Sequence, residues 1–189
     1  MEYPNWFKMS AVRFFEYYLK DYAGMPNLNY LQIGTYTGDA SLWLINSILT
    51  DPSSTLTDVD TWEGSEEEVH KEFNWKSLEQ TYDDKVSQYN NIIKYKGKSL
   101  DFLQSAKSDY YDFIYIDGDH TEAGVYSDAI NSWGKLKSGG VLAFDDYHWQ
   151  HESGLDELRP APAIDRFVSE HADSLRVLEI GWQYWIIKK

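Results

Sequence analysis

The stretch that decides the fold is Phe113-Ile-Tyr-Ile-Asp-Gly-Asp-His120, in which an apolar run leads directly into two acids and a histidine. An uninterrupted apolar run is typical of a strand that is buried on both faces of a parallel sheet. Residues 139–148 repeat this design as Gly-Gly-Val-Leu-Ala-Phe-Asp-Asp-Tyr-His. Because α/β sheets bind ligands beyond the carboxyl ends of their strands, the two stretches predict one shared site with four carboxylates and two imidazoles. The alternative is that the acids only cap the helices that follow, since Asp is a favoured N-cap.

The composition limits the kinds of protein and partner. The chain has 189 residues, of which 42% are hydrophobic, and this is enough for one domain with a sizeable core. It contains no cysteine, which excludes disulfides, zinc-thiolate sites and a cysteine nucleophile. A net charge of −14 predicts that the chain does not bind nucleic acid by its own charge. No signal peptide or membrane span is visible in the sequence, so we expect a cytoplasmic protein without a membrane partner.

A glycine loop follows the first predicted strand, residues 30–33. Gly34 and Gly38 enclose Thr35-Tyr36-Thr37, and helical patterning continues over residues 39–49. A strand, a glycine loop and a helix open a nucleotide-binding α/β domain, although an ordinary strand–helix turn explains the loop nearly as well. The Gly-x-x-x-Gly spacing matches neither the dinucleotide fingerprint nor a P-loop.

The next two predicted strands end in polar residues. Strand 56–59 leads to Asp60, about 20 residues beyond the glycine loop, where an acid accepts hydrogen bonds from ribose hydroxyls. The ring of Trp62 fits either stacking on a base or packing in the core. Strand 91–96 leads to Ser99, which we expect to be the N-cap of a helix over residues 100–106.

The remaining segments complete one domain, residues 1–189. The N-terminal extension, 1–28, contains an amphipathic helix whose aromatic residues fit the core, a lid over a ligand or a dimer face, with the core as the default. The irregular stretch 147–162, rich in aromatic, His and Pro residues, is predicted to be a lid or a substrate wall. We also expect helices over 121–136 and 163–172, and an antiparallel hairpin formed by 175–180 and 183–187.

This alternation of strands and helices resembles the class I S-adenosylmethionine-dependent methyltransferase fold, from about Tyr30 to the C-terminus. The stretches 32–41, 58–62, 112–120 and 139–147 carry the resemblance. The group that they resemble most is methyltransferase domain 24, which is related to metal-dependent O-methyltransferases of the catechol, macrocin and aminocoumarin types. The resemblance implies an α/β fold, a Rossmann-like three-layer sandwich. Its seven-stranded sheet would be mostly parallel, with the order 3-2-1-4-5-7-6 and a C-terminal antiparallel hairpin.

The resemblance also implies where S-adenosylmethionine binds. The glycine loop would hold the methionine part of the cofactor, Asp60 the ribose, and Trp62 and Ser99 would lie near adenine. Gln32 stands where the class usually has an acid that contacts the cofactor's amino group. The implied cofactor-binding residues are Gln32, Gly34, Thr35, Tyr36, Gly38, Ser41, Asp60, Thr61, Trp62, Ser99 and Asp117.

A divalent cation and a general base are implied in the same way. Asp117, Asp145 and Asp146 match metal-binding positions, and Mg²⁺ is expected because hard cations prefer carboxylate oxygens. Such a cation would lower the pKa of a substrate hydroxyl. Asp119 matches a position proposed as the general base, and His120 is the adjacent alternative.

The function implied is O-methylation of a small hydroxylated molecule. The catechol-type enzymes have a Lys soon after their first metal-binding Asp, whereas residues 118–121 here are Gly-Asp-His-Thr, so a sugar or other polyol fits better than a catechol. Two alternatives stay open: an enzyme similar to the cephalosporin hydroxylases, and a non-catalytic module that binds a cofactor or a partner. The aromatic residues are also compatible with a homodimer.

Overall fold

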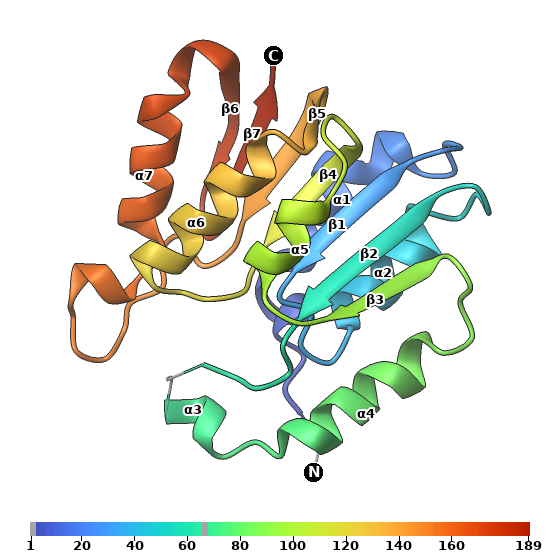
Figure 1. Cartoon of the computed structure of the whole chain (residues 1–189), viewed down its shortest axis with the longest axis horizontal. Helices are drawn as coiled ribbons and strands as arrows, with labels where there is room; N and C mark the ends of the chain where they lie inside the picture. The colour runs from blue at the N-terminus through green and yellow to red at the C-terminus, as the bar shows by residue number, and fades with distance from the viewer. Residues whose placement is uncertain (1–2, 66–67) are drawn as a thin grey trace.

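The computed structural model describes residues 3–65 and 68–189, and its centre is a seven-stranded sheet (Figure 1). The strand order is β3-β2-β1-β4-β5-β7-β6. Strands β1 to β5 pair in parallel, whereas β7 is antiparallel to both β5 and β6. The predicted order and C-terminal hairpin are therefore confirmed. The strands are β1 (Asn29–Ile33), β2 (Thr55–Asp60), β3 (Ile92–Lys96), β4 (Tyr111–Ile116), β5 (Leu136–Phe144), β6 (Leu175–Ile180) and β7 (Tyr184–Lys188).

Helices cover both faces of the sheet, which confirms the predicted three-layer sandwich. In Figure 1, α5, α6 and α7 lie in front of the sheet, while α1 and α2 lie behind it. The helix predicted within the N-terminal extension, 1–28, is observed as three joined pieces, η1, α1 and η2. The helical segments are η1 (Phe7–Ala11), α1 (Val12–Leu19), η2 (Lys20–Tyr22), α2 (Asp39–Ser47), α3 (Glu68–Lys71), α4 (Trp75–Val86), α5 (Ser99–Ser105), α6 (Glu122–Trp133), η3 (Asp156–Leu158), α7 (Ala161–Glu170) and η4 (Ala172–Ser174).

The alternation of side chains along each strand divides the core into two layers. Leu31 and Ile33 of β1 belong to the cluster that includes side chains of α5, α6 and α7. Tyr30 belongs to the cluster on the other face, together with Phe15 of α1 and Leu44 of α2. Successive residues of a strand point to opposite faces, so Gln32 shares the face of Tyr30. A polar side chain is thus carried into the interior, just before the glycine loop begins.

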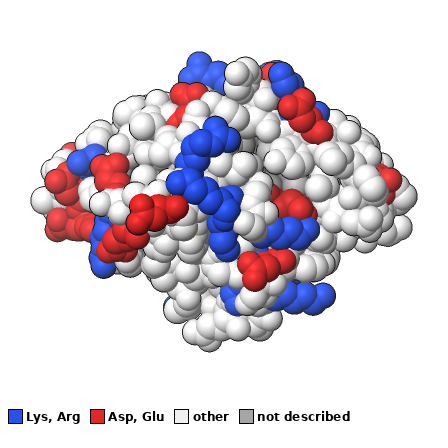
Figure 2. All heavy atoms as spheres, turned by 90° about the horizontal axis from the view of Figure 1, so that it is seen from above, with Lys and Arg blue, Asp and Glu red and all other residues white. Residues whose placement is uncertain are grey.

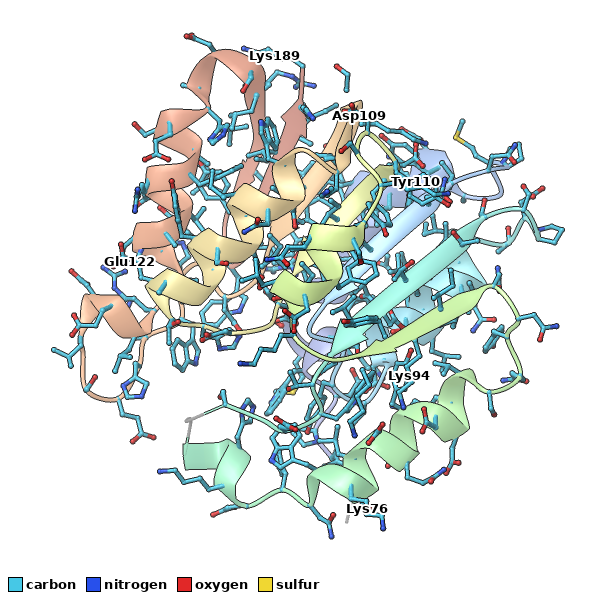
Figure 3. All side chains as sticks on the ribbon, in the orientation of Figure 1. Lys76, Lys94, Asp109, Tyr110, Glu122 and Lys189 are labelled. Atoms are coloured by element: carbon cyan, nitrogen blue, oxygen red, sulfur yellow. The ribbon has the colours of Figure 1, made fainter. Side chains whose placement is uncertain are left out.

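Helix α4 is held against β3 by Lys94, which is labelled in Figure 3. The Lys94 Nζ donates to Glu79 Oε1 at 2.8 Å and to Asp83 Oδ1 at 2.6 Å. The same ammonium lies 4.5 Å from the centre of the Trp62 ring, a cation–π arrangement. Lys94 therefore links two elements, helix α4 and the segment after β2 that carries Trp62.

The helix predicted over residues 121–136 is shorter in the structure, because it spans Glu122–Trp133 and Leu136 is already the first residue of β5.

Two further details differ from the sequence-based expectations. Ser99 is the first residue of α5 and Lys98 is the N-cap, so the prediction that Ser99 caps this helix is wrong. The physical reason is competition, because the Ser99 hydroxyl donates instead to Asp128 of α6. Helix α7 begins at Ala161, two residues earlier than expected, directly after Pro160. Among the described residues, none of the helices has the length and apolar character needed to cross a membrane.

Candidate active site

Three side chains meet beyond the carboxyl ends of β4 and β5. The His120 Nε2 lies 3.5 Å from Asp117 Oδ1 and 3.3 Å from Asp146 Oδ2. One potential ligand atom from each residue lies within 4.8 Å of the other two. Asp117 directly follows β4, and Asp146 comes shortly after its parallel neighbour β5, so the sheet itself brings these acids together. Two carboxylates and an imidazole could hold a divalent cation.

Asp145, the third predicted metal ligand, is engaged by the protein interior. Its Oδ2 accepts a hydrogen bond from the Tyr115 hydroxyl, and its Oδ1 accepts the backbone N–H of Asp146 at 2.8 Å. Gln183 Nε2 donates to Tyr115 Oη at 3.0 Å, and Trp185 Nε1 donates to Gln183 Oε1 at 3.0 Å. Burial, together with the charge of Asp146, raises the pKa of Asp145 to about 7. The role of Asp145 as a ligand stays a prediction.

Asp119, the predicted general base, lies in the loop just before α6. It is exposed, and its Oδ1 accepts the backbone N–H of Thr121 at 2.9 Å. Its other oxygen lies so close to Gly124 that a Cβ added there would come within 2.4 Å of it. The N-cap of α6 is Thr121, whose Oγ1 accepts the N–H of Gly124 at 3.1 Å, so Asp119 holds the residue at the cap and does not cap the helix itself. Its role as a base is still a prediction.

Asp60 organises the glycine loop. Its Oδ2 accepts the backbone N–H groups of Thr35 at 2.8 Å and Tyr36 at 3.0 Å. Gly34 has a φ of +82°, and a Cβ added there would lie 1.9 Å from the carbonyl oxygen of Asp117. The loop is therefore packed directly against the end of β4, so the predicted cofactor loop and the acidic cluster are adjoining parts of one site. Asp60 Oδ1 accepts the backbone N–H of Trp62 at 2.8 Å, so three of about four acceptor positions are occupied, and a ribose hydroxyl could use the one that remains.

A buried polar network lies beneath this loop. Gln32 and Asp58 are register neighbours on β1 and β2, and Gln32 Nε2 donates to Asp58 Oδ1 at 2.8 Å. The same amide donates to Ser41 Oγ at 2.9 Å, and the Tyr82 hydroxyl donates to Asp58 Oδ2 at 2.8 Å. Burial raises the pKa of Asp58 to about 6. Asp58 was not among the predicted site residues, although an acid inside a predicted buried strand is a usable signal.

The turn into α2 is packed against the same Tyr82. Gly38 has a φ of +77°, and a Cβ added there would lie 2.8 Å from the Tyr82 ring. The Trp62 ring is only 2% exposed and lies 4.8 Å from that ring, so it packs in the core, one of its two expected roles. Thr61 lies nearer the surface, where its Oγ1 accepts the N–H of Glu63 at 3.3 Å.

Three buried polar atoms near the glycine loop have no hydrogen-bond partner among the described residues. They are Gln32 Oε1, Thr35 Oγ1 and Tyr36 Oη. A buried polar group without a partner costs about 1–3 kcal/mol, so such groups are uncommon in native structures. A polar cofactor bound at this loop would supply partners, and the amide oxygen of Gln32 suits an ammonium group in particular. The residues present therefore fit S-adenosylmethionine.

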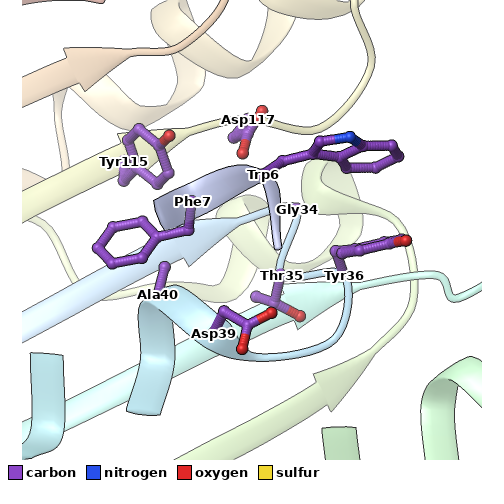
Figure 4. A pocket seen from close by; sticks show the side chains of 9 residues that line it. All are labelled: Trp6, Phe7, Gly34, Thr35, Tyr36, Asp39, Ala40, Tyr115 and Asp117. Carbon is purple, nitrogen blue, oxygen red and sulfur yellow. The ribbon is translucent and has the colours of Figure 1, made fainter. Parts of the chain in front are cut away.

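A small cavity of about 50 Å³ lies between the glycine loop and the N-terminal segment (Figure 4). Trp6 and Phe7 line it together with Tyr36 and Asp117. The Trp6 ring stacks on the Tyr36 ring, with centroids 4.6 Å apart. Ligand pockets usually measure about 300–1,000 Å³, so this cavity by itself is smaller than a nucleotide-sized ligand. A lid over a ligand was one of the three roles expected for the N-terminal aromatic residues, although packing in the core was the default, and two of them line this cavity.

Comparison with solved structures finds the same fold in several methyltransferases. The O-methyltransferase from Bacillus cereus, solved in complex with SAH, is 19% identical, with a TM-score of 0.60, over 85% of this chain and 74% of that one. TomG from Streptomyces achromogenes, an O-methyltransferase involved in tomaymycin synthesis, is 15% identical, with a TM-score of 0.59, over 85% and 73%. A putative rRNA-methylase from Clostridium thermocellum is 9% identical, with a TM-score of 0.70, over 100% and 98%. At these identities the likeness establishes the fold. Comparison with curated protein sequences gives no match.

The sheet order, the glycine loop and the acid at the end of β2 define a class I S-adenosylmethionine-dependent methyltransferase. A family model described as a methyltransferase domain matches residues 31–147, which is more than half of the chain. The chain therefore belongs to this methyltransferase domain family. The match covers the glycine loop and the strand ends that carry Asp60, Asp117 and Asp146.

Proposed function

We propose that this methyltransferase transfers the methyl group of S-adenosylmethionine to a hydroxyl oxygen of a small molecule, with the help of a divalent cation. The observation that carries the proposal is the meeting of Asp117, His120 and Asp146 directly beside the glycine loop. Methyl transfer needs the acceptor oxygen in line with the sulfonium methyl group, and the protein contributes chiefly this alignment. A cation site next to the cofactor loop is a suitable place to hold the acceptor.

In this proposal the cofactor lies across the carboxyl ends of β1 and β2. Its methionine part occupies the glycine loop, where Gln32, Thr35 and Tyr36 have buried polar atoms without partners among the described residues. Its ribose lies against Asp60, at the end of β2. The adenine then extends toward the end of β3, because β3 is the neighbour of β2 on the side away from β4.

Asp117, His120 and Asp146 would hold the cation. Their two carboxylates suit Mg²⁺ or Mn²⁺, and the imidazole favours Mn²⁺ as the more nitrogen-tolerant of the two. When bound, such a cation lowers the pKa of an acceptor hydroxyl and fixes its position. Since His120 serves as a ligand in this arrangement, the exposed carboxylate of Asp119 is left to accept the hydroxyl proton.

The acceptor in this proposal is a sugar or another polyol. Trp149, in the irregular segment after β5, has its ring 5.2 Å from that of His120, and Trp182 Nε1 donates to Asp146 Oδ1 at 3.0 Å. These rings offer apolar faces and polar edges beside the acidic cluster. A nucleic-acid acceptor is disfavoured by the net charge of −14, and on the face seen in Figure 2 acidic and basic side chains are interspersed. The cytoplasmic location and the homodimer expected from the sequence stay predictions.

The test is titration calorimetry with S-adenosylhomocysteine, followed by Mn²⁺ and Mg²⁺, on the native protein and on single variants. We expect Asp117→Asn, His120→Gln and Asp146→Asn each to weaken cation binding at least tenfold, since loss of one of three ligands removes a large share of the affinity. Asp173→Asn, an exposed acid far along the chain in η4, is the control. Loss of binding in Asp145→Asn but not in His120→Gln would instead restore the all-carboxylate set predicted from the sequence. Absence of S-adenosylhomocysteine binding would refute the proposal. Methyl transfer to a panel of sugars and polyols then identifies the acceptor class.

A further inference from the structure

The turn of the C-terminal hairpin contacts the segment that follows β5. Trp182 Nε1 donates to Asp146 Oδ1 at 3.0 Å, and the backbone N–H of Tyr147 donates to the Trp182 carbonyl oxygen at 2.9 Å. The turn lies between β6 and β7, and β7 pairs with β5. The sheet therefore brings a residue from near the end of the chain to the side chain of a proposed cation ligand.

The turn itself does not require a tryptophan. Turns favour Gly, Pro, Asn, Asp and Ser, whereas the Trp182 side chain is large and 37% exposed. Docking of the hairpin is already provided by the backbone, because Phe144 of β5 is the register partner of Tyr184 and the N–H of Tyr147 is bonded to the turn. The indole hydrogen bond is thus not needed to hold the hairpin in place, and its main effect is on Asp146.

This hydrogen bond divides the two oxygens of the Asp146 carboxylate. Oδ1 accepts the indole N–H, while Oδ2 lies 3.3 Å from His120 Nε2, on the side of the proposed cation site. The last torsion of an Asp side chain has only broad preferences, so an unheld carboxylate turns easily. Holding Oδ1 therefore presents Oδ2 to the site in a fixed direction. Carboxylates that bind metal ions are commonly held in this way by surrounding hydrogen-bonding groups.

The backbone of Asp146 is held in an uncommon conformation. Its φ is +55°, in the left-handed region that residues other than glycine seldom adopt. Its N–H donates to Asp145 Oδ1 at 2.8 Å, and its carbonyl oxygen accepts the N–H of Trp149 at 2.9 Å. Such conformations persist where the surrounding structure holds them, and they cluster at functional sites. With the backbone fixed on both sides, Trp182 controls the freedom that remains, which is the direction of the carboxylate.

We propose that Trp182 is a positioning residue for the cation, because its indole N–H holds Asp146 so that Oδ2 faces the site shared with Asp117 and His120. This inference rests on the proposed cation site. It adds a residue that lies outside the stretch 31–147 matched by the family model. Trp182 does not touch the cation in this arrangement and acts through Asp146 alone. The C-terminal hairpin thereby completes a site whose ligands follow β4 and β5.

The experiment measures Mn²⁺ affinity by titration calorimetry in the native protein and in Trp182→Phe. This change keeps an aromatic ring and the backbone hydrogen bond to Tyr147, but it removes the N–H donor. We expect Mn²⁺ to bind about tenfold more weakly, the lower end of the usual effect of losing such a partner, because the indole is uncharged and partly exposed. Trp75→Phe is the matched control, since it removes an indole donor to the His70 carbonyl oxygen at the start of α4 and should leave Mn²⁺ affinity unchanged.

Two readouts separate positioning from a general loss of structure. In the Asp146→Ala background, Trp182→Phe should have no further effect on Mn²⁺ affinity, because the carboxylate through which it acts is gone. At saturating Co²⁺, the visible absorption spectrum should change in Trp182→Phe and stay like that of the native protein in Trp75→Phe, since the spectrum reports the geometry of the ligands. Thermal unfolding without added metal checks that each variant is folded.

The outcomes separate this inference from the proposed function. Native Mn²⁺ affinity and a native Co²⁺ spectrum in Trp182→Phe overturn this inference alone, and the proposed cation site stands. A loss of affinity that is equally large in the Asp146→Ala background also overturns it, because Trp182 would then act by a route other than Asp146. A native protein that binds neither ion overturns the proposed cation site and this inference together.

Discussion

The contact between the glycine loop and the end of β4 can be tested by replacing Gly34 with alanine. Gly34 has a φ of +82°, and the new Cβ would lie 1.9 Å from the carbonyl oxygen of Asp117 and 2.8 Å from the Cα of Gly118. Both neighbours are backbone atoms, so no side-chain rotation relieves the clash. The loop and the strand end must move apart.

Gly139 offers a matched control, because its φ is +79° and a Cβ added there meets nothing within 4 Å. Alanine at either position incurs the cost of a left-handed backbone, about 1–2 kcal/mol, partly offset in both variants by the lower entropy of the unfolded chain. Only Gly34→Ala adds overpacking, which costs about 1–3 kcal/mol. The difference between the two variants is therefore expected to be about 1–3 kcal/mol, or several degrees in melting temperature for a chain of this size.

The assay is guanidinium unfolding followed by circular dichroism, with both variants measured beside the native protein. We expect Gly34→Ala to be the less stable variant and to bind Mn²⁺ more weakly, because the displaced carbonyl belongs to Asp117 itself. Gly139→Ala should bind Mn²⁺ like the native protein. Equal losses of stability in the two variants, together with unchanged cation binding in Gly34→Ala, would refute the argument that the two loops form one packed unit.

Three further predictions concern buried and partly buried side chains. Because the pKa values of Asp58 and Asp128 are raised to about 6, the folded state holds protons that the unfolded chain has lost. The free energy of unfolding should thus fall as the pH rises from about 4 to 6, by about 3 kcal/mol for each group at most, and Asp58→Asn should flatten this dependence in urea titrations at pH 5 and 7.5. Trp185→Phe removes the donor to Gln183 Oε1 and should lower stability by about 1–3 kcal/mol in the same assay. Trp6→Ala widens the cavity at the glycine loop and should speed S-adenosylhomocysteine association in stopped-flow fluorescence, whereas an unchanged rate would show that this side chain does not obstruct the cofactor.

The sheet could be predicted from the sequence because its signals are local. Apolar runs that end in acids mark the central strands, and the parallel pairing of β4 and β5 then brings Asp117 and Asp146 to one edge. The class resemblance supplied the strand order and the terminal hairpin. Once the ends of these strands and their parallel pairing are known, the position of the two acids at the edge of the sheet follows almost directly.

The predictions that failed or stayed incomplete depend on contacts between distant segments. Ser99 was expected to cap its own helix, but its hydroxyl donates a hydrogen bond to Asp128, 29 residues away on α6. The orientation of Asp145 depends on Tyr115, which is held in turn by Gln183 just before β7. Trp6 has the pattern of an ordinary amphipathic helix residue, and only the tertiary fold places it against the glycine loop. Local patterns contain no information about such partners.

The total charge of the proposed cation ligands at the ends of β4 and β5 suits a divalent cation. Asp145 is held toward the interior by a hydrogen-bond chain, because its Oδ2 accepts the Tyr115 hydroxyl, which in turn accepts from Gln183. His120 is brought to Asp117 by the short turn between them, at an Nε2 to Oδ1 distance of 3.5 Å. A neutral imidazole with two carboxylates carries a charge of −2, which matches a divalent cation, whereas three ionised carboxylates would repel one another in its absence. The mixed set of Asp117, His120 and Asp146 is therefore the arrangement that we propose, while the role of Asp145 as a ligand stays a prediction.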